Sequence, residues 1–155
     1  MENNPSLGAM NISGVTIKSP VELQYMKQAG EVVRKTKKII KEAIDSGVST
    51  SDLDRIAEKE IRKQGAVPSF KGLYGFPATI CTSINHEIVH GIPSVKRVLK
   101  TGDIISVDVG AVVGGFHADS AFTVSIGNVD ERVRKLITDT SESLKCGIEK
   151  AVPEG

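Results

Sequence analysis

Apolar residues recur at helical spacing over three stretches of the chain, 20–47, 49–65 and 128–153. The first stretch opens with Ser19-Pro20-Val21-Glu22, which combines an N-cap serine, a proline at the first helical position and a glutamate three residues after the cap. Each stretch ends at a glycine or a proline, as helices commonly do. The pattern therefore predicts three helices, the third of which starts near residue 128 or 130.

The first helix is predicted to be amphipathic, with an apolar stripe toward the core and a basic opposite face. The apolar stripe comprises Leu23, Met26, Ala29, Val33, Ile40 and Ile44. The basic face comprises Lys27, Arg34, Lys35, Lys38 and Lys41. A basic face of this kind could contact ribosomal RNA transiently, but a solvated helix surface is the simpler interpretation. The third helix carries a similar stripe of Val133, Leu136, Ile137, Leu144 and Ile148.

Between the second and third helices the apolar pattern changes to one that favours strands. Residues 67–77 form a loop rich in Gly, Pro and aromatic residues, and residues 79–92 predict a strand with mixed faces. The runs 103–113 and 116–126 flank Gly114-Gly115 and predict an antiparallel hairpin. The order helix, helix, strand, hairpin, helix suggests that a second repeat begins with the last helix.

The alternation of side chains along the hairpin assigns its two faces. One face is apolar on both strands, with Ile105, Val107, Val109 and Ala111 matching Phe116, Ala118, Phe122, Val124 and Ile126. Pairing apolar face with apolar face places Asp108 and Asp119 together on the other face. If Val113-Gly114 is the turn, the aspartates lie directly opposite, with Cβ atoms about 4.5–5.5 Å apart. If Gly114-Gly115 is the turn, they are diagonal neighbours.

Two carboxylates this close repel one another unless a cation or a shared proton lies between them. One interpretation is a divalent-metal site on paired strands, as in two-metal hydrolases. The other is a pair of acids on a solvated sheet face, where salt screens the repulsion. Spacing alone leaves both interpretations open. His117 shares this face and could be a ligand, a proton carrier or an ordinary surface histidine.

Composition narrows the class of protein. The chain has 155 residues, 39% apolar and 25% charged, with a formal charge of +1, so neither nucleic acid nor a membrane is indicated as a specific partner. Two cysteines do not make a disulfide framework and favour the cytoplasm. No run is long enough to span a bilayer, and the N-terminus lacks the pattern of a secretory signal. Residues 1–14 are expected to be a flexible arm.

Three motifs of the chain resemble the type I bacterial methionine aminopeptidases, and the resemblance extends over residues 15–155. The motifs are residues 84–93, INHEIVHGIP, residues 99–110, LKTGDIISVDVG, and residues 115–121, GFHADSA. Their order and separation match the family. One departure is Ala118, where many relatives have glycine, and it should not disturb the neighbouring acids.

This resemblance implies an α+β pita-bread fold, of which the chain would hold the first αβ half and the first helix of the second half. It implies a cofactor of two divalent ions (Mn, Fe, Co or Zn) that activate a bridging water against the first peptide bond. By position, Asp108 would be a bidentate ligand of one ion, Asp119 would bridge both, and His90 would hydrogen-bond the substrate near the scissile amide. The substrates would be nascent proteins that begin with methionine.

The family also has an apolar pocket for the methionine side chain beside the metals. Phe76 and Cys81 match pocket positions, and Phe70 and Leu73 are further candidates. Aromatic and sulfur groups suit a thioether side chain, which they bind by burial and S–aromatic contact. The alternative is that these residues are ordinary core.

In the family, one His and two Glu from the second half complete the metal shell, and these would lie beyond Gly155. We therefore expect the chain to be truncated and inactive alone. Two rival interpretations remain. One is a relative of the Xaa-Pro aminopeptidases and prolidases, which share the paired aspartates. The other is a non-catalytic pita-bread module used for binding.

Overall fold

The two predicted β-rich runs form one long antiparallel hairpin in the computed structural model, which describes residues 10–12 and 15–153. Strand β5 (Ile104–Val113) pairs with β6 (Phe116–Ser125) along its whole length. The turn is Gly114-Gly115, and both glycines have a positive φ that side chains rarely adopt. Of the two registers left open by the sequence, this is the diagonal one, since Asp108 lies opposite Ala121 and Asp119 opposite Gly110.

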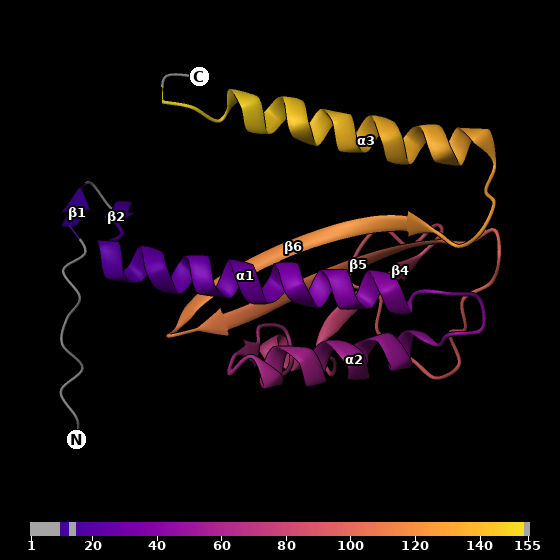
Figure 1. Cartoon of the computed structure of the whole chain (residues 1–155), viewed down its shortest axis with the longest axis horizontal. Helices are drawn as coiled ribbons and strands as arrows, with labels where there is room; N and C mark the ends of the chain where they lie inside the picture. The colour runs from indigo at the N-terminus through magenta and orange to yellow at the C-terminus, as the bar shows by residue number, and fades with distance from the viewer. Residues whose placement is uncertain (1–9, 13–14, 154–155) are drawn as a thin grey trace.

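Strand β5 is the centre of a four-stranded antiparallel sheet. On the side away from β6 it pairs first with β4 (Ile80–Ile84) and then, near its end, with the short β3 (Val67–Pro68). Helices α1 (Pro20–Ala43) and α2 (Thr50–Lys63) contact this sheet and one another. Figure 1 shows the two helices lying along the sheet, with α1 beside β5 and β6.

Both helices begin as their sequences predict. Ser19 and Glu22 form a capping box at the start of α1, and Ser49 and Asp52 form another at the start of α2. The core between helices and sheet is apolar and closely follows the predicted alternation of β5. It contains Val32, Val33, Ile40, Leu53, Ala57, Ile61, Ile80, Ile105, Val107, Val109 and Ala111. The predicted stripe of α1 was wrong at Leu23 and Met26, which are exposed, while Val32 and Thr36 are buried.

The predicted strand over residues 79–92 was wrong in its length. Only Ile80–Ile84 is a strand, because Asn85 has a φ of 54° and turns the chain away from the sheet. The Asn85 side chain secures this turn, as it donates to Asp103 Oδ1 at 2.8 Å and accepts the Ile104 N–H at 3.0 Å. The chain then returns to β4, where the Thr82 N–H donates to the Gly91 carbonyl at 2.7 Å. His90 therefore lies on a loop and not at a strand end.

Residues 1–14 were predicted to form a flexible arm, and the structure describes one part of this segment, Met10–Ile12. These residues form strand β1, which pairs antiparallel with β2 (Val15–Ile17). The remainder of the predicted arm, residues 1–9 and 13–14, lies outside the described residues.

Helix α3 (Glu131–Lys150) follows the hairpin and starts at the predicted N-cap Asp130. In Figure 1 it runs along the outer side of β6, separated from the other helices. No residue of α3, all of which the structure describes, is buried. Leu136, Leu144 and Ile148 are more than half exposed, so the predicted stripe exists but has little to pack against. Within residues 10–12 and 15–153, no helix is long and apolar enough to cross a membrane.

The exposed stripe of α3 and the outer edge of β6 should make the 155-residue chain associate, since exposed apolar patches and free strand edges favour self-contact. We expect larger species at high concentration in size-exclusion chromatography with light scattering. Replacing Leu136 and Leu144 by Lys should shift the distribution toward the monomer. Replacing the exposed polar residues Thr138 and Ser143 by Lys is the matched control. A monomer with one sharp unfolding transition in the unsubstituted chain would contradict this expectation.

Candidate metal and peptide site

The two predicted acids converge on the sheet face opposite α1 and α2. Asp108 is half-buried on β5 and Asp119 is exposed on β6, in the diagonal register described above. Diagonal positions of this kind lie about 7–8 Å apart between backbones, within reach of side chains that lean toward each other. The two carboxyl groups are close enough to share a hydrogen bond.

This convergence perturbs the protonation of Asp108. Burial, followed by the hydrogen bond with Asp119 and the negative charge of Asp119, raises the pKa of Asp108 to about 6. The Val109 N–H and the nearby charge of His90 act in the opposite direction. An acid pair with these properties holds a proton between its members or attracts a cation in its place.

Cys81 lies on β4 directly opposite Asp108 and is buried. Burial, followed by the charges of Asp108 and Asp119, raises the pKa of the Cys81 thiol to about 11. The thiol is therefore protonated at neutral pH. Since metals bind the thiolate, Cys81 is better suited to line a pocket than to act as a ligand.

His90 is brought to the same place by the loop after β4. Its backbone has a φ of 60°, the left-handed region that residues other than glycine seldom occupy. Such a conformation costs roughly 1–3 kcal/mol and persists only where the surrounding structure enforces it. His90 is exposed, and its ring is near enough to Asp108 to influence that group's pKa.

All the predicted pocket residues meet these polar groups in one cleft of about 450 Å³. The predicted residues that line the cleft are Phe70, Leu73, Phe76, Cys81, His90, Asp108 and Asp119. Sequence reasoning missed four further lining residues, Tyr74, Gly75, Pro77 and Ile92. The sequence held one signal for Tyr74, which is its position between Gly72 and Gly75. In the structure Tyr74 lies in the short 3-10 turn Leu73–Gly75 with a φ of 49°.

The apolar wall of the cleft is fixed to the sheet at its first residues. The Ser69 N–H donates to the Gly110 carbonyl at 3.0 Å, and the Phe70 ring lies against Gly110. A Cβ at position 110 would come within 2.6 Å of a Phe70 ring atom, so the glycine makes room for the ring. His117 does not line the cleft, and its Nδ1 instead lies 3.2 Å from Ser69 Oγ. His117 thus contacts the residue that precedes Phe70 in the wall of the cleft.

A larger hollow of about 640 Å³ lies between α1 and β6. Its lining is basic and includes Lys37, whose Nζ donates to Ser120 Oγ at 2.6 Å and to the Ala121 carbonyl at 3.1 Å. Burial, followed by the charge of Lys41, lowers the pKa of Lys37. Glu42 and Asp119 also line the hollow, but its lining contains no aromatic residue and includes neither Asp108 nor His90, so the smaller cleft is the candidate site.

The acid pair suits a divalent cation in part. Its carboxylate oxygens are the donors that hard cations prefer, and a cation between them would remove the repulsion that raises the pKa of Asp108. Among the described residues, however, no group of three or more His, Cys, Asp and Glu side chains could hold a metal. The pair therefore fits as two ligands of a larger set.

Comparison with known proteins identifies the family. Residues 24–155 match the metallopeptidase family M24, and the chain belongs to that family. It is 54% identical over 138 residues to a methionine aminopeptidase of Clostridium acetobutylicum, covering 89% of this chain and 55% of the relative. It is 50% identical over 139 residues to methionine aminopeptidase 1 of Bacillus subtilis, covering 90% and 56%. The chain thus spans about half the length of these curated relatives.

Solved structures agree on the fold. The methionine aminopeptidase of Thermotoga maritima superposes with a TM-score of 0.87 at 38% identity, covering 88% of this chain and 55% of that one. The X-Pro aminopeptidase of the same organism superposes with a TM-score of 0.64 at 25% identity, covering 77% and 32%. The predicted α+β pita-bread fold and the predicted resemblance to methionine aminopeptidases are therefore confirmed.

The repulsion between the acids should appear in the stability of the metal-free chain. The folded state holds the Asp108 proton more tightly than the unfolded state, so stability is lost as pH rises through about 6. Asp108→Asn should therefore unfold at a higher temperature than the unsubstituted chain at pH 7.5. Solvent screening keeps the gain to a few degrees, since about 1 kcal/mol shifts the midpoint of a chain this size by about 2–4 °C.

The measurement is thermal unfolding by circular dichroism, with chelator present, at pH 5 and pH 7.5. The gain from Asp108→Asn should shrink at pH 5, where Asp108 already carries a proton. Asp130→Asn is the matched control, because Asp130 is an exposed helix cap and asparagine caps equally well. An equal effect of Asp108→Asn at both pH values would count against a shared proton.

Proposed function

We propose that this chain forms the metal- and methionine-binding side of an enzyme that removes the N-terminal methionine from nascent proteins. One observation carries the proposal. Asp108, Asp119 and His90 line the same cleft as the aromatic wall and Cys81, although they come from distant parts of the sequence. A methionine-specific exopeptidase requires polar groups that can act on a peptide bond, and beside them an apolar pocket large enough for the methionine side chain.

In this proposal Asp108 would be a ligand of one divalent ion, and Asp119 would be a ligand shared by two. Both are hard oxygen donors, which suit Mn or Fe, while Co and Zn are also possible. The ions, when bound, would supply an activated water for attack on the first peptide bond. The pair's own contribution is electrostatic, because two ionised carboxylates offset the positive charge that the metals bring to the cleft.

His90 is proposed to hydrogen-bond the substrate near the scissile amide. Its exposure at the cleft suits contact with a ligand, and its left-handed backbone is the kind of strain found at functional sites. The aromatic rings of Phe70 and Phe76, together with the protonated thiol of Cys81, are proposed to bind the methionine side chain. Leu73 would contribute to the same wall.

The rival functions are less well supported. An Xaa-Pro aminopeptidase or prolidase would share the fold, but the identity to the solved X-Pro aminopeptidase is 25%, against 54% and 50% to the curated methionine aminopeptidases. A non-catalytic binding module would not need the acid pair, whose repulsion is a cost without a metal.

Two further expectations concern the cellular location of the enzyme and its contact with the ribosome. Both cysteines are free, which fits the proposed cytoplasmic location. A transient ribosome contact through the basic face of α1 receives little support. Arg34 and Lys35 pair with Glu31, Lys38 pairs with Glu42, and Lys41 lies over the Phe122 ring. Glu31 and Glu42 thus compensate part of the charge on this face within α1.

Titration with Mn²⁺ tests the proposed metal ligands directly. Since the residues that the structure describes offer only two ligands, we expect weak binding, with a Kd on the order of 10⁻⁴–10⁻³ M, as in the weaker calcium modules. Asp108→Asn and Asp119→Asn should each weaken binding at least about tenfold, which corresponds to roughly 1.4 kcal/mol. Asp130→Asn serves as control and should bind as the unsubstituted chain does. Equal Mn²⁺ affinity in all four proteins would show that Asp108 and Asp119 are not the ligands of the bound ion.

Cleavage of Met-Ala-Ser tests the completeness of the site. With Mn²⁺ or Co²⁺ added, the 155-residue chain should give no turnover above the metal-only control, because two carboxylates cannot hold both ions firmly. Turnover at a rate typical of enzymes, on the order of 1–10³ s⁻¹, would overturn this expectation. In that case, comparison of Met-Ala with Xaa-Pro peptides would separate the proposed activity from its closest rival.

A further inference from the structure

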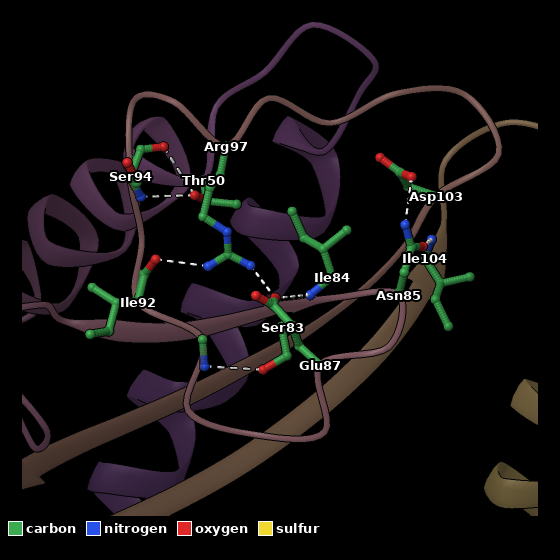
Figure 2. A network of polar contacts seen from close by, with 11 residues as sticks. Thr50, Ser83, Ile84, Asn85, Glu87, Ile92, Ser94, Arg97, Asp103 and Ile104 are labelled. Atoms are coloured by element: carbon green, nitrogen blue, oxygen red, sulfur yellow. Dashed lines mark hydrogen bonds and ion pairs between the residues drawn. The ribbon is translucent and has the colours of Figure 1, made fainter.

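The loop that carries His90 is held by a polar network and not by apolar packing. Ile88 and Val89, immediately before His90, are 87% and 65% exposed and contribute nothing to the core. Yet His90 keeps a left-handed backbone, which needs external support. Figure 2 shows the polar contacts around this loop, which link its two ends to β4 and to the start of α2.

We propose that Arg97, acting together with Glu87, is a positioning residue that holds His90 toward the cleft. The inference rests on the proposed function in one respect, that His90 meets the substrate there. Neither residue lines the cleft, so their effect would be exerted through the backbone of the loop.

The Arg97 guanidinium joins the two ends of the loop. It forms an ion pair with the Glu87 carboxylate, three residues before His90, and donates to the Ile92 carbonyl at 2.8 Å, two residues after it. The planar, forked guanidinium is well suited to bind both groups at once, whereas a lysine ammonium lacks the rigid fork. The side chains of Arg97 and Glu87 are only 23% and 35% exposed, so water screens this pair less than the pairs on the helix surfaces.

Both members of the pair are themselves fixed. Glu87 Oε2 also accepts the Ile84 N–H at 2.6 Å, which ties it to the end of β4. The Arg97 carbonyl accepts the Thr50 N–H at 2.9 Å, at the first turn of α2. The buried Thr50 hydroxyl adds two contacts with Ser94, at 2.9 Å to its N–H and 3.1 Å to its carbonyl. The ion pair therefore connects the loop to two rigid elements.

Gly91 fixes the position directly after His90. Its N–H donates to Ser83 Oγ at 3.2 Å, and its carbonyl accepts the Thr82 N–H at 2.7 Å. A Cβ at position 91 would lie 2.1 Å from the Thr82 carbonyl oxygen, so only glycine can approach β4 this closely. With Gly91 and Glu87 both anchored, the backbone between them has little freedom to turn His90 away.

Arg97→Gln tests this role, because it removes the charge and the fork. Arg97→Lys restores the charge without the fork. Glu87→Gln is the milder partner variant, since its amide oxygen can still accept the Ile84 N–H. Arg34→Gln is the matched control, because the Arg34–Glu31 pair lies on the exposed surface of α1.

The readout is the order of the His90 backbone, measured by ¹⁵N relaxation, beside the unfolding temperature of each variant. In the unsubstituted chain and in Arg34→Gln, we expect order parameters of about 0.85 at His90 and Gly91. In Arg97→Gln and Glu87→Gln they should fall below about 0.6, with Arg97→Lys between these limits. Amide exchange at Thr82, which donates to Gly91, should become about tenfold faster or more. His117 should be unaffected.

A positioning role requires these changes to be local. Unchanged order at His90 in Arg97→Gln would overturn the proposal. So would a loss of order throughout the chain in both Arg97→Gln and Glu87→Gln, because the pair would then hold the whole fold and not the loop. Gly91→Ala gives an independent check, and it should loosen His90 in the same way.

The same samples separate this inference from the function on which it rests. Arg97→Gln should keep the Mn²⁺ affinity of the unsubstituted chain to within about twofold, since Asp108 and Asp119 are untouched. Met-Ala-Ser should still shift the signals of Phe76 and Cys81 in Arg97→Gln, while its effect on His90 should be lost. If the unsubstituted chain binds neither Mn²⁺ nor peptide, the proposed function fails, and the order of His90 still decides whether Arg97 positions it.

Discussion

The pairing of β5 with β6 is the constraint on which the remaining structure depends. Side chains alternate along both strands, so the pairing register of β5 with β6 determines on which face of the sheet each residue of the hairpin lies. Ile105, Val107 and Val109 then lie beneath the helices, and Asp108 and Asp119 are left together on the opposite face. A shift of one residue would bury the acids and expose the core. The energy of the hydrophobic core therefore also enforces the geometry of the acid pair.

Local signals were enough to predict the parts of the fold in which pattern and packing agree. The helix cap at Ser19, the start of the second helix near residue 49 and the alternation of the hairpin all appear in the structure as expected. The prediction of a strand over residues 79–92 was wrong because the Asn85 side chain contacts residues 103 and 104. These contacts are distant in the sequence, so the local pattern does not predict them. The prediction that Leu23 and Met26 face the core was wrong for a related reason. Helical periodicity does not reveal where the sheet beneath a helix ends.

Of the candidate site, the acid pair could be predicted from the sequence pattern, whereas the cleft around it could not. The proximity of Asp108 and Asp119 follows from strand parity, and only the choice between opposite and diagonal required coordinates. The cleft itself could not be derived from spacing. It depends on Phe70 resting on Gly110 and on a loop that carries His90 back across β4, which are long-range contacts. Resemblance to a family supplied these residues, but it did not supply the polar network that holds them.

The environment of Cys81 has a practical consequence for chemical labelling. Alkylating reagents and peroxides attack the thiolate, and at neutral pH almost none of Cys81 is in that form beside the two aspartates. Cys146, by contrast, is exposed on α3. A maleimide dye or spin label should thus attach selectively to the outer helix of the native chain without an engineered cysteine replacement, and would report on that helix while leaving the cleft chemically intact.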